Sequence, residues 1–403
     1  MIKRTLQELC LNITDGKHGD CENEENSGYY FISCKDIFDG QINYKNARQI
    51  TKADFEETHK RTMLEVDDIL LTNSGTIGRM AFVTDREATT KTTFQKSVAI
   101  IKPDKQKVLP RYLYYQLQNC VPQFINSSNG SAQKNLLLST MRTFQIEIEE
   151  NREKQEKIAN TLSAYDDLIE NNQKQIKLLE EAAQRLYKEW FVDLRFPGHE
   201  NTKIVDGVPE GWNECTVESF GTVITGKTPP TSNKEYYTNG KVPFVTIPDM
   251  HNVVYPLKTE KRLTIEGAQT QKNKYIPPNS VMISCIGTVG LVSIATEVCQ
   301  TNQQINSIIL NNEDDLYFFY ESMLRMKDLL DGLGSNGATM TNVNKSKLEK
   351  LIIISPSKDI VKQYNDVCKP LFESALNLSR KNVYLKNMRE ALLPKLMSGE
   401  VEV

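Results

Sequence analysis

The amino-acid sequence lacks the features that define several protein classes. No apolar run among its 403 residues approaches the roughly 20 residues that a membrane-spanning helix needs. The eight cysteines contain no C-x-x-C pair, the four histidines form no metal-binding pattern, and no signal peptide opens the chain. We therefore expect a cytoplasmic protein with reduced thiols, without a bound metal and without a membrane partner.

Strong charge and catalytic motifs are also missing. Lysine and arginine total 49 against 52 acidic residues, for a net charge of −3. Nucleic-acid-binding proteins are usually basic, so this balance weakly favours another partner, although a basic face can be offset by acid elsewhere. The sequence contains no acid cluster that recurs along the chain with metal-ligand spacing, no glycine-rich cofactor fingerprint and no N-P-P-Y or D-P-P-Y type run for methyl transfer to a base. We predict that the chain is not an enzyme and has no catalytic residues.

One segment matches a catalytic motif, but the residues that follow it do not fit. Residues Gly221–Thr228, GTVITGKT, satisfy the G-x-x-x-x-G-K-[ST] pattern of a phosphate-binding loop. In such a loop a helix starts at the Lys-Thr end and turns its free N–H groups toward the phosphates. Here Pro229 and Pro230 follow, and a residue before proline is disfavoured in helical conformation. A nucleotide hydrolase is therefore only a minor alternative, which a nucleotide-binding assay on the lone chain tests.

Most of the sequence occurs twice along the chain. Leu71–Val83 (LTNSGTIGRMAFV) returns as Ile283–Ala295 (ISCIGTVGLVSIA), with both glycines kept. Four further segments recur in the same order: TLQELCLNITDGK (5–17) with TVESFGTVITGK (216–227), YFISCKDI (30–37) with PFVTIPDM (243–250), RYLYYQLQ (111–118) with LYFFYESM (316–323), and NGSAQKN (129–135) with NGATMTN (336–342). Lys17 thus corresponds to Lys227, and a shared turn explains both lysines better than a nucleotide site in one copy. Repetition on this scale predicts two similar domains.

Each copy ends in a long tract with helical periodicity. Apolar residues alternate at spacings of 4 and 3 from Ile158 to Trp190 and again from Tyr364 to Leu396, with charged residues between them. This pattern predicts a coiled-coil seam. A helix over the first tract would be roughly 48 Å long, which is more than one domain needs, so we expect the two helices to pack against each other, antiparallel. The seam residues are Ile158, Leu162, Ile169, Asn172, Ile176, Leu179, Leu186, Leu371, Leu378, Asn382, Leu385, Leu392 and Leu396.

The globular segments predict an α/β fold of the mixed α+β kind. Short β-like runs such as DILLT, SVAIIK, SVMIS and INSIIL are separated by turns rich in glycine, asparagine and proline. The expected organisation is a pseudo-two-fold repeat of domain and long helix. Its predicted boundaries are 1–150 for the first domain, 151–195 for its helix, 196–358 for the second domain and 359–403 for the second helix.

Together these motifs resemble the specificity (S) subunit of type I restriction-modification enzymes. The segment 211–250 is similar to the start of a target recognition domain, with Lys227 replacing a glycine of the usual GGTP-like turn. GTIGRMAFV and GTVGLVSIA resemble the G-[ST]-x-G turn of these domains, and GSAQKNL resembles their GSTQKNL-like loop. The two long tracts resemble the central and distal spacer helices. The first copy lacks the P-x-G-W lead-in, and GATMTNV in the second lacks the Gln-Lys pair.

The resemblance implies a non-catalytic DNA-binding subunit. Each recognition domain would read one half of a bipartite double-stranded target, and the helices would fix the spacer and dock two methyltransferase (M) subunits. S-adenosylmethionine would be bound by those subunits, and ATP and Mg by restriction (R) subunits where cleavage accompanies methylation; this chain would bind no cofactor. The alternative from another class is a scaffold that pairs two protein partners without meeting DNA, which the net charge of −3 favours slightly.

The expected DNA-binding residues lie in the repeated turns and loops. Lysine, arginine, serine, threonine and backbone N–H groups suit phosphates, whereas arginine, asparagine and glutamine suit base edges. The glycines have the alternative role of forming the turns. The candidates are Lys17, Ser74, Gly75, Thr76, Gly78, Arg79, Gln133, Lys134, Asn135, Lys227, Thr228, Gly287, Thr288, Gly290, Thr341 and Asn342.

Overall fold

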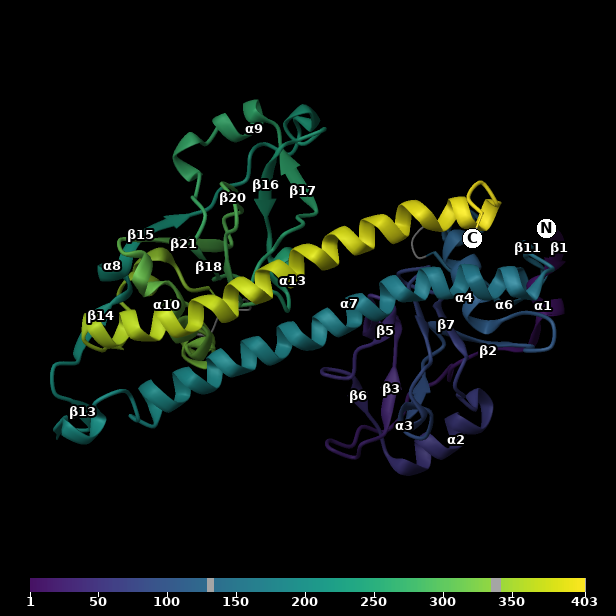
Figure 1. Ribbon diagram of the computed structural model, residues 1–403, viewed down its shortest axis with the longest axis horizontal. Helices are drawn as coiled ribbons and strands as arrows, with labels where there is room; N and C mark the ends of the chain where they lie inside the picture. The colour runs from purple at the N-terminus through teal and green to yellow at the C-terminus, as the bar shows by residue number, and fades with distance from the viewer. Residues whose placement is uncertain (129–133, 335–341, 403) are drawn as a thin grey trace. The chain divides into compact units, whose positions relative to one another are not determined.

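The computed structural model describes residues 1–128, 134–334 and 342–402 (Figure 1). The chain divides into two compact units, Met1–Leu168 with Leu385–Val403, and Ile169–Tyr384. Each unit contains one copy of the sequence repeat and a part of both long helices, α7 (Arg152–Tyr187) and α13 (Lys358–Ser398).

The first unit is built on a four-stranded antiparallel sheet of order β2-β10-β7-β8. A smaller sheet of order β6-β3-β9 contains a parallel pair, β3 with β9, and β1 pairs with β11. The strands are β1 (Ile2–Thr5), β2 (Cys10–Asp15), β3 (Tyr30–Ile32), β4 (Ile37–Phe38), β5 (Gln41–Ile42), β6 (Arg48–Gln49), β7 (Ile69–Thr72), β8 (Met80–Phe82), β9 (Thr92–Phe94), β10 (Val98–Pro103) and β11 (Gln145–Ile148). The helices are α1 (Leu6–Leu9), α2 (Lys52–Thr62), α3 (Arg86–Thr89), α4 (Pro110–Asn119), α5 (Val121–Asn126) and α6 (Leu138–Thr143).

The central strand β7 is buried along its whole length because both of its faces are covered. Successive side chains of a strand point to opposite faces. Ile69 and Leu71 pack into the cluster that contains Tyr112 of α4, and Leu70 packs with Phe94 on the other face. A continuous apolar run bounded by turns is therefore the sequence signature of this strand.

The second unit repeats these three sheets, whereas the short pair β4–β5 belongs to the first unit and the short pair β12–β13 to the second. Its sheets have the orders β15-β21-β18-β19, β17-β16-β20 and β14-β22, again with one parallel pair, β16 with β20. In β18, Val281 and Ile283 face one cluster and Met282 faces the other. The strands are β12 (Ile204–Val205), β13 (Val208–Pro209), β14 (Asn213–Thr216), β15 (Gly221–Thr225), β16 (Val242–Val245), β17 (Lys261–Leu263), β18 (Val281–Ser284), β19 (Val292–Ile294), β20 (Gln300–Thr301), β21 (Ile305–Leu310) and β22 (Ile352–Ser355). Its helices are α8 (Val217–Phe220), α9 (Ile265–Gln269), α10 (Leu316–Arg325), α11 (Lys327–Gly334) and α12 (Lys345–Glu349).

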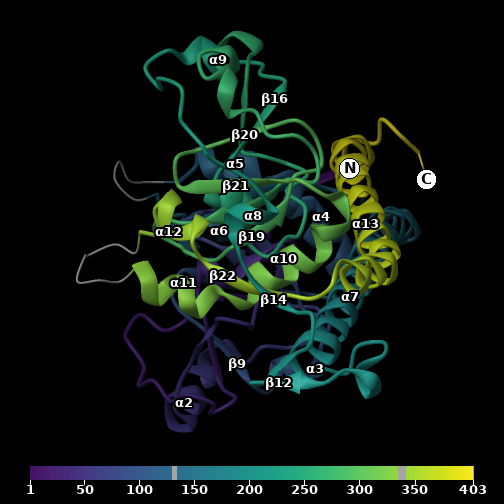
Figure 2. The ribbon, with the colours of Figure 1, turned by 90° about the vertical axis from the view of Figure 1, so that its left-hand side faces the viewer.

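Corresponding elements begin in the same way in the two units. Thr51 caps α2 by accepting a hydrogen bond from the backbone of Asp54, and Thr264 caps α9 through the backbone of Gly267. Figure 2 shows α9 beside the small sheet that contains β16. The predicted mixed fold with an internal repeat is confirmed.

The long helices pair antiparallel, as predicted. Within the second unit, Asn172 Nδ2 donates to Asn382 Oδ1 at 2.8 Å, and Tyr364 Oη donates to the carbonyl of Ala183 at 3.2 Å. Residue numbers thus rise along α7 while those of their partners fall along α13. All thirteen predicted seam residues are buried or half-buried, with Leu162 fully buried. The polar Asn172–Asn382 pair in an apolar seam is the kind of contact that sets register.

The first long helix ends earlier than its periodicity suggests. The α-helix stops at Tyr187 and continues as a short π-helix over Lys188–Val192. Trp190 and Phe191 therefore leave the seam spacing and pack around Tyr364, with ring centroids at 5.8 and 5.0 Å. An aromatic cluster, rather than the coiled coil, sets this end of the helix.

Candidate nucleic-acid interface

The G-[ST]-x-G turn of the first unit is a closed loop between β7 and β8. Gly78 N and Thr72 N close it by donating to the carbonyls of Thr72 and Arg79 at 3.0 and 2.8 Å. The Thr72 hydroxyl accepts from Arg79 N at 2.9 Å. Gly75 and Gly78 have φ of 79° and 94°, and a Cβ on Gly78 would lie 2.5 Å from Val121. The two glycines are therefore required by the turn itself.

The second unit closes its turn with the same bonds. Gly290 N donates to the Ser284 carbonyl at 2.9 Å, and the Ser284 hydroxyl accepts from Leu291 N at 2.8 Å. Gly287 and Gly290 both have φ of 81°. A Cβ on Gly290 would lie 2.7 Å from Lys327, so the glycine pair again has a structural reason.

The structure brings each turn together with the second predicted loop of its unit. Ser74 forms an antiparallel bridge with Asn135, and Ile286 forms the equivalent bridge with Asn342. Lys134, Asn135 and Asn342 are exposed, as are Gly75, Thr76, Arg79, Gly287 and Thr288. The candidates Gln133 and Thr341 lie outside the described residues.

A third segment joins these loops and was missed by the sequence analysis. We call it the linking loop: residues 95–97 in the first unit and 302–304 in the second. Lys96 N donates to the Lys17 carbonyl at 3.0 Å, and Ser97 O accepts from Asn73 N at 3.0 Å. The middle residue of each loop, Lys96 or Gln303, is exposed and its neighbours are half-buried. The available signal was the polar segment directly before SVAIIK and INSIIL at the same place in both copies.

The second unit connects its segments through the same backbone positions. Cys285 N donates to the Gln304 carbonyl at 2.7 Å, as Asn73 N does to Ser97. Lys227 N donates to the Thr301 carbonyl at 3.0 Å, as Lys17 N does to Phe94 at 2.8 Å. Each unit thus gathers the lysine turn, the glycine turn, the linking loop and the loop that ends in Asn135 or Asn342.

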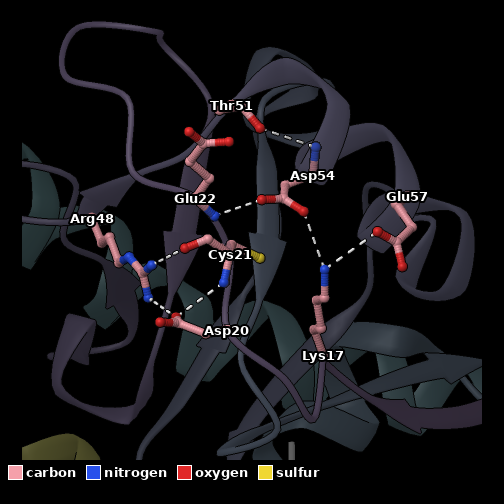
Figure 3. Close-up of polar contacts among 8 residues, drawn as sticks. All are labelled: Lys17, Asp20, Cys21, Glu22, Arg48, Thr51, Asp54 and Glu57. Atoms are coloured by element: carbon pink, nitrogen blue, oxygen red, sulfur yellow. Dashed lines mark hydrogen bonds and ion pairs between the residues drawn. The ribbon is translucent and has the colours of Figure 1, made fainter.

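The two predicted lysines differ in whether their ammonium groups have carboxylate partners. Lys17 Nζ lies 3.2 Å from Asp54 Oδ1 and 3.3 Å from Glu57 Oε2 on α2 (Figure 3). The backbone N–H of Glu22 and the Lys17 ammonium hold the pKa of the Asp54 carboxyl below its usual range. The two carboxylates compete with a phosphate, so this geometry favours a structural role for Lys17. The DNA contact of Lys17 remains a prediction.

The corresponding lysine of the second unit is exposed. Within the described part of the chain, Lys227 has no ion pair, because Gly267 occupies the position of Asp54 at the start of the helix. Its carbonyl accepts from Gln271 Nε2 at 2.5 Å, which fixes the turn through the backbone instead. Lys227 therefore carries the free charge that a phosphate contact needs.

The exposed charge around the four segments also differs between the units. The first unit has a basic cluster of exposed residues with no carboxylate partner among the residues described: Lys35, Arg79, Lys96 and Lys134. The carbonyl of Cys34, next to Lys35, accepts from Arg79 Nη1 at 3.5 Å, and Cys34 N donates to Ser97 Oγ at 3.1 Å. In the repeat these four positions are the neutral Pro248, Leu291, Gln303 and Thr341.

Two buried or half-buried aspartates at equivalent positions, and the segment that matches the phosphate-loop pattern, have structural roles. Asp36 and Asp249 each cap a short 3-10 helix by accepting from the backbone N–H and hydroxyl of Ser33 or Thr246 at 2.7–2.9 Å. In the phosphate-loop look-alike, Gly221–Thr225 is a strand and no helix begins at Thr228. The geometry that would hold nucleotide phosphates is therefore lacking at this segment.

Among the described residues, no group of three or more histidine, cysteine, aspartate or glutamate side chains could hold a metal ion. No described helix combines the length and apolar character that a membrane crossing requires.

Comparison with known proteins decides the family. The type I restriction modification DNA specificity domain matches residues 3–181 and 209–383, one copy for each repeat. The chain belongs to this family. It is a specificity subunit whose two recognition domains give a type I restriction-modification complex its DNA sequence preference, and its partners are DNA and the other subunits of such a complex.

Individual relatives agree with this assignment. The chain is 33% identical over 367 residues to the specificity subunit of the type I restriction enzyme HindI of Haemophilus influenzae, covering 75% of this chain and 80% of that protein. It is 29% identical to the MjaIX specificity subunit of Methanocaldococcus jannaschii, over 93% and 87% of the two chains. The crystal structure of a type I S subunit from M. genitalium has the same fold, with a TM-score of 0.57, 15% identity and coverage of 98% and 95%.

Proposed function

We propose that this specificity subunit is non-catalytic and reads a bipartite DNA target, one half-site for each recognition domain, for a DNA adenine methyltransferase. The observation that carries the proposal is the repeated arrangement of the lysine turn, the glycine turn, the linking loop and the loop that ends in Asn135 or Asn342. Most of the backbone bonds that join these segments recur in both units, whereas the exposed side chains differ. A constant frame with different exposed side chains suits two domains that read different sequences.

The partner subunits supply the chemistry in this proposal. Adenine methylation requires a base to leave the stack and enter a catalytic pocket. We assign that pocket and S-adenosylmethionine to two methyltransferase subunits docked on the specificity subunit, and ATP and Mg to restriction subunits where these are present. The specificity subunit itself binds no cofactor.

Mapping of N6-methyladenine in cells with and without the gene tests this proposal. The expected result is a split motif with one modified adenine in each part, which disappears when the gene is deleted. The paired antiparallel helices make a second measurement informative. Insertion of whole turns into both helices should lengthen the unread spacer of the motif.

The alternative is a scaffold that joins two protein partners without touching DNA, which the net charge of −3 favours slightly. Purified methyltransferase complex separates the two functions, because a scaffold gives no preference for a duplex with the mapped motif over one with scrambled sequence. Methylation that is unchanged in the deletion strain would contradict the DNA-reading role.

A further inference from the structure

The linking loop of the second unit presents the exposed amide of Gln303. Asn302 and Gln304 bond each other, since Asn302 Nδ2 donates to Gln304 Oε1 at 3.0 Å and Gln304 N donates to Asn302 Oδ1 at 3.1 Å. Asn302 N also donates to the Val245 carbonyl at 3.2 Å. These bonds hold the residues on both sides of Gln303, whose side chain is exposed.

Thr228 orients the Gln303 side chain. The Thr228 hydroxyl donates to Gln303 Oε1 at 2.5 Å. Thr228 itself stands on a fixed turn, because Lys227 N donates to the Thr301 carbonyl at 3.0 Å and Tyr237 Oη donates to the Pro229 carbonyl at 2.7 Å. Within the described residues Gln303 Nε2 has no partner, so the amide is held by one atom and offers the other.

The remaining hydrogen-bonding capacity of Gln303 matches one base edge. An amide oxygen has two lone pairs, and Thr228 uses one of them, so Gln303 still offers one acceptor site and an N–H donor. Adenine presents an N6 donor beside the N7 acceptor in the major groove, whereas guanine presents two acceptors. A glutamine with its oxygen held in place therefore pairs with adenine in two bonds and places oxygen against oxygen at guanine.

We propose that Gln303, positioned by Thr228, reads an adenine in the half-site bound by the second recognition domain. The proposal rests on the DNA-reading function proposed above and assigns a base preference to one side chain. Lys96 occupies the same position in the first domain, between neighbours held by equivalent bonds: Gln95 N donates to the Ile32 carbonyl as Asn302 N does to Val245, and Ser97 O accepts from Asn73 N as Gln304 O does from Cys285 N. An ammonium group carries only donors and suits the two acceptors of guanine, so the two positions provide a matched pair.

The test compares methylation motifs produced in cells by the full complex containing the wild-type chain, Gln303→Ala, Gln303→Lys or Thr228→Val. Gln303→Ala should make one adenine position of one half-site degenerate, with discrimination against guanine reduced roughly 5- to 150-fold in competition binding of purified complex. Gln303→Lys should shift the same position toward guanine. Thr228→Val should weaken discrimination there by a smaller factor, because it removes only the orientation of the amide.

The matched control is Lys96→Gln. It should change the half-site bound by the first recognition domain and leave the half-site bound by the second domain unaltered. Retention of the unaltered half-site shows in each variant that the chain folds and assembles. If Gln303→Ala abolishes methylation, the Gln303→Lys variant tests the base preference instead, because it keeps a long donor side chain at that position. A motif unchanged in both Gln303 variants overturns the assignment, as does degeneracy at a position other than adenine. Absence of a bipartite motif with the wild-type chain instead overturns the proposed function.

Discussion

In the first unit the joint between the globular part and the long helices is polar, whereas in the second unit the same joint is aromatic. Tyr115 Oη donates to Asp166 Oδ2 at 2.5 Å, and Arg389 forms an ion pair with the same carboxylate. Phe372 occupies the position of Asp166 in the repeat and stacks on Tyr317 with ring centroids 4.4 Å apart and planes within 8°. One backbone arrangement is thus stabilised by two kinds of contact.

The candidate interfaces show the same kind of difference. Four positive charges surround the linking loop of the first unit, and four neutral residues occupy their places in the second. The near-zero net charge of the whole chain therefore hides a local basic cluster. Charge in the first domain suits affinity for phosphates, and the amides of the second domain suit readout of bases.

The largest effect expected from this difference follows from removal of the basic cluster. Each phosphate contact contributes about 0.9 to the slope of log K against log salt. Loss of three phosphate-binding charges, together with the base contact assigned to Lys96, should lower the slope by roughly 3 and weaken binding about 100- to 1000-fold. The measurement is binding of the assembled complex to its target over a salt series. The variant replaces Lys35, Arg79, Lys96 and Lys134.

A control with the same change in net charge separates local from overall charge. It replaces four lysines of the first unit that already pair with carboxylates: Lys3, Lys52, Lys91 and Lys105. The control should keep most of the salt slope. If the two variants lost equal amounts of salt slope and affinity, overall charge rather than the basic cluster would account for DNA binding.

The second effect concerns one buried position that is an acid in the second unit and an amide in the first. Glu321 on α10 is 1% exposed, and burial raises its pKa from 4.5 to about 8. The folded state therefore binds one more proton than the unfolded state between these values, and stability falls as pH rises from about 4.5 to about 8. Glu321→Gln should remove this dependence and raise the free energy of unfolding by about 2–3 kcal/mol at pH 8.

The matched change is Gln116→Glu in the first unit, where Gln116 is 4% exposed and Nε2 donates to the Glu147 carbonyl. This variant should acquire the pH dependence that Glu321→Gln loses. Urea unfolding between pH 5 and 9 measures both. A wild-type stability that does not decrease over this range would contradict the buried-acid explanation.

The third effect tests whether the polar joint can be replaced by an apolar one. Arg389→Ala leaves Asp166 without its ionic partner, and Asp166→Phe leaves the arginine alone. Both side chains are about 20% exposed, so each single change should cost about 2 kcal/mol, below the usual cost for a fully buried pair. The double variant gives positions 389 and 166 the side chains that Ala183 and Phe372 have at the corresponding positions of the second unit, and it should be more stable than either single variant.

Thermal unfolding of the four proteins completes the double-mutant cycle. If the stability losses of the two single variants add up in the double variant, the ion pair contributes little. The helices are then held at this joint by the surrounding apolar contacts of Leu162 and Leu396.

The repeat and the helices were predictable because each has a period in the sequence. DILLT in the first unit and SVMIS in the second form equivalent buried strands. The seam spacing placed Asn172 opposite the tract that contains Asn382. The glycine turns were also recognisable, since a left-handed φ restricts the choice of residue.

The linking loop and the pairing of Lys17 were not predictable in this way. Residues 95–97 are short, polar and without a period, and they gain their place only when β9 pairs in parallel with β3. Lys17 meets Asp54 through a contact 37 residues along the chain. Such contacts depend on how the small sheet and α2 pack, which no local pattern in the sequence shows.

The smallest effect separates the two lysines that the repeat places at equivalent positions. Lys227→Ala removes a free charge and should lower the salt slope by about 0.9, weakening binding roughly fivefold at physiological salt. Lys17→Ala should leave the slope nearly unchanged and lower the midpoint of thermal unfolding, because Asp54 and Glu57 lose their partner. Salt-series binding and thermal unfolding of both variants measure the two outcomes. If Lys17→Ala lowers the slope as much as Lys227→Ala, DNA must release Lys17 from its carboxylates, and the two lysine turns are functionally equivalent after all.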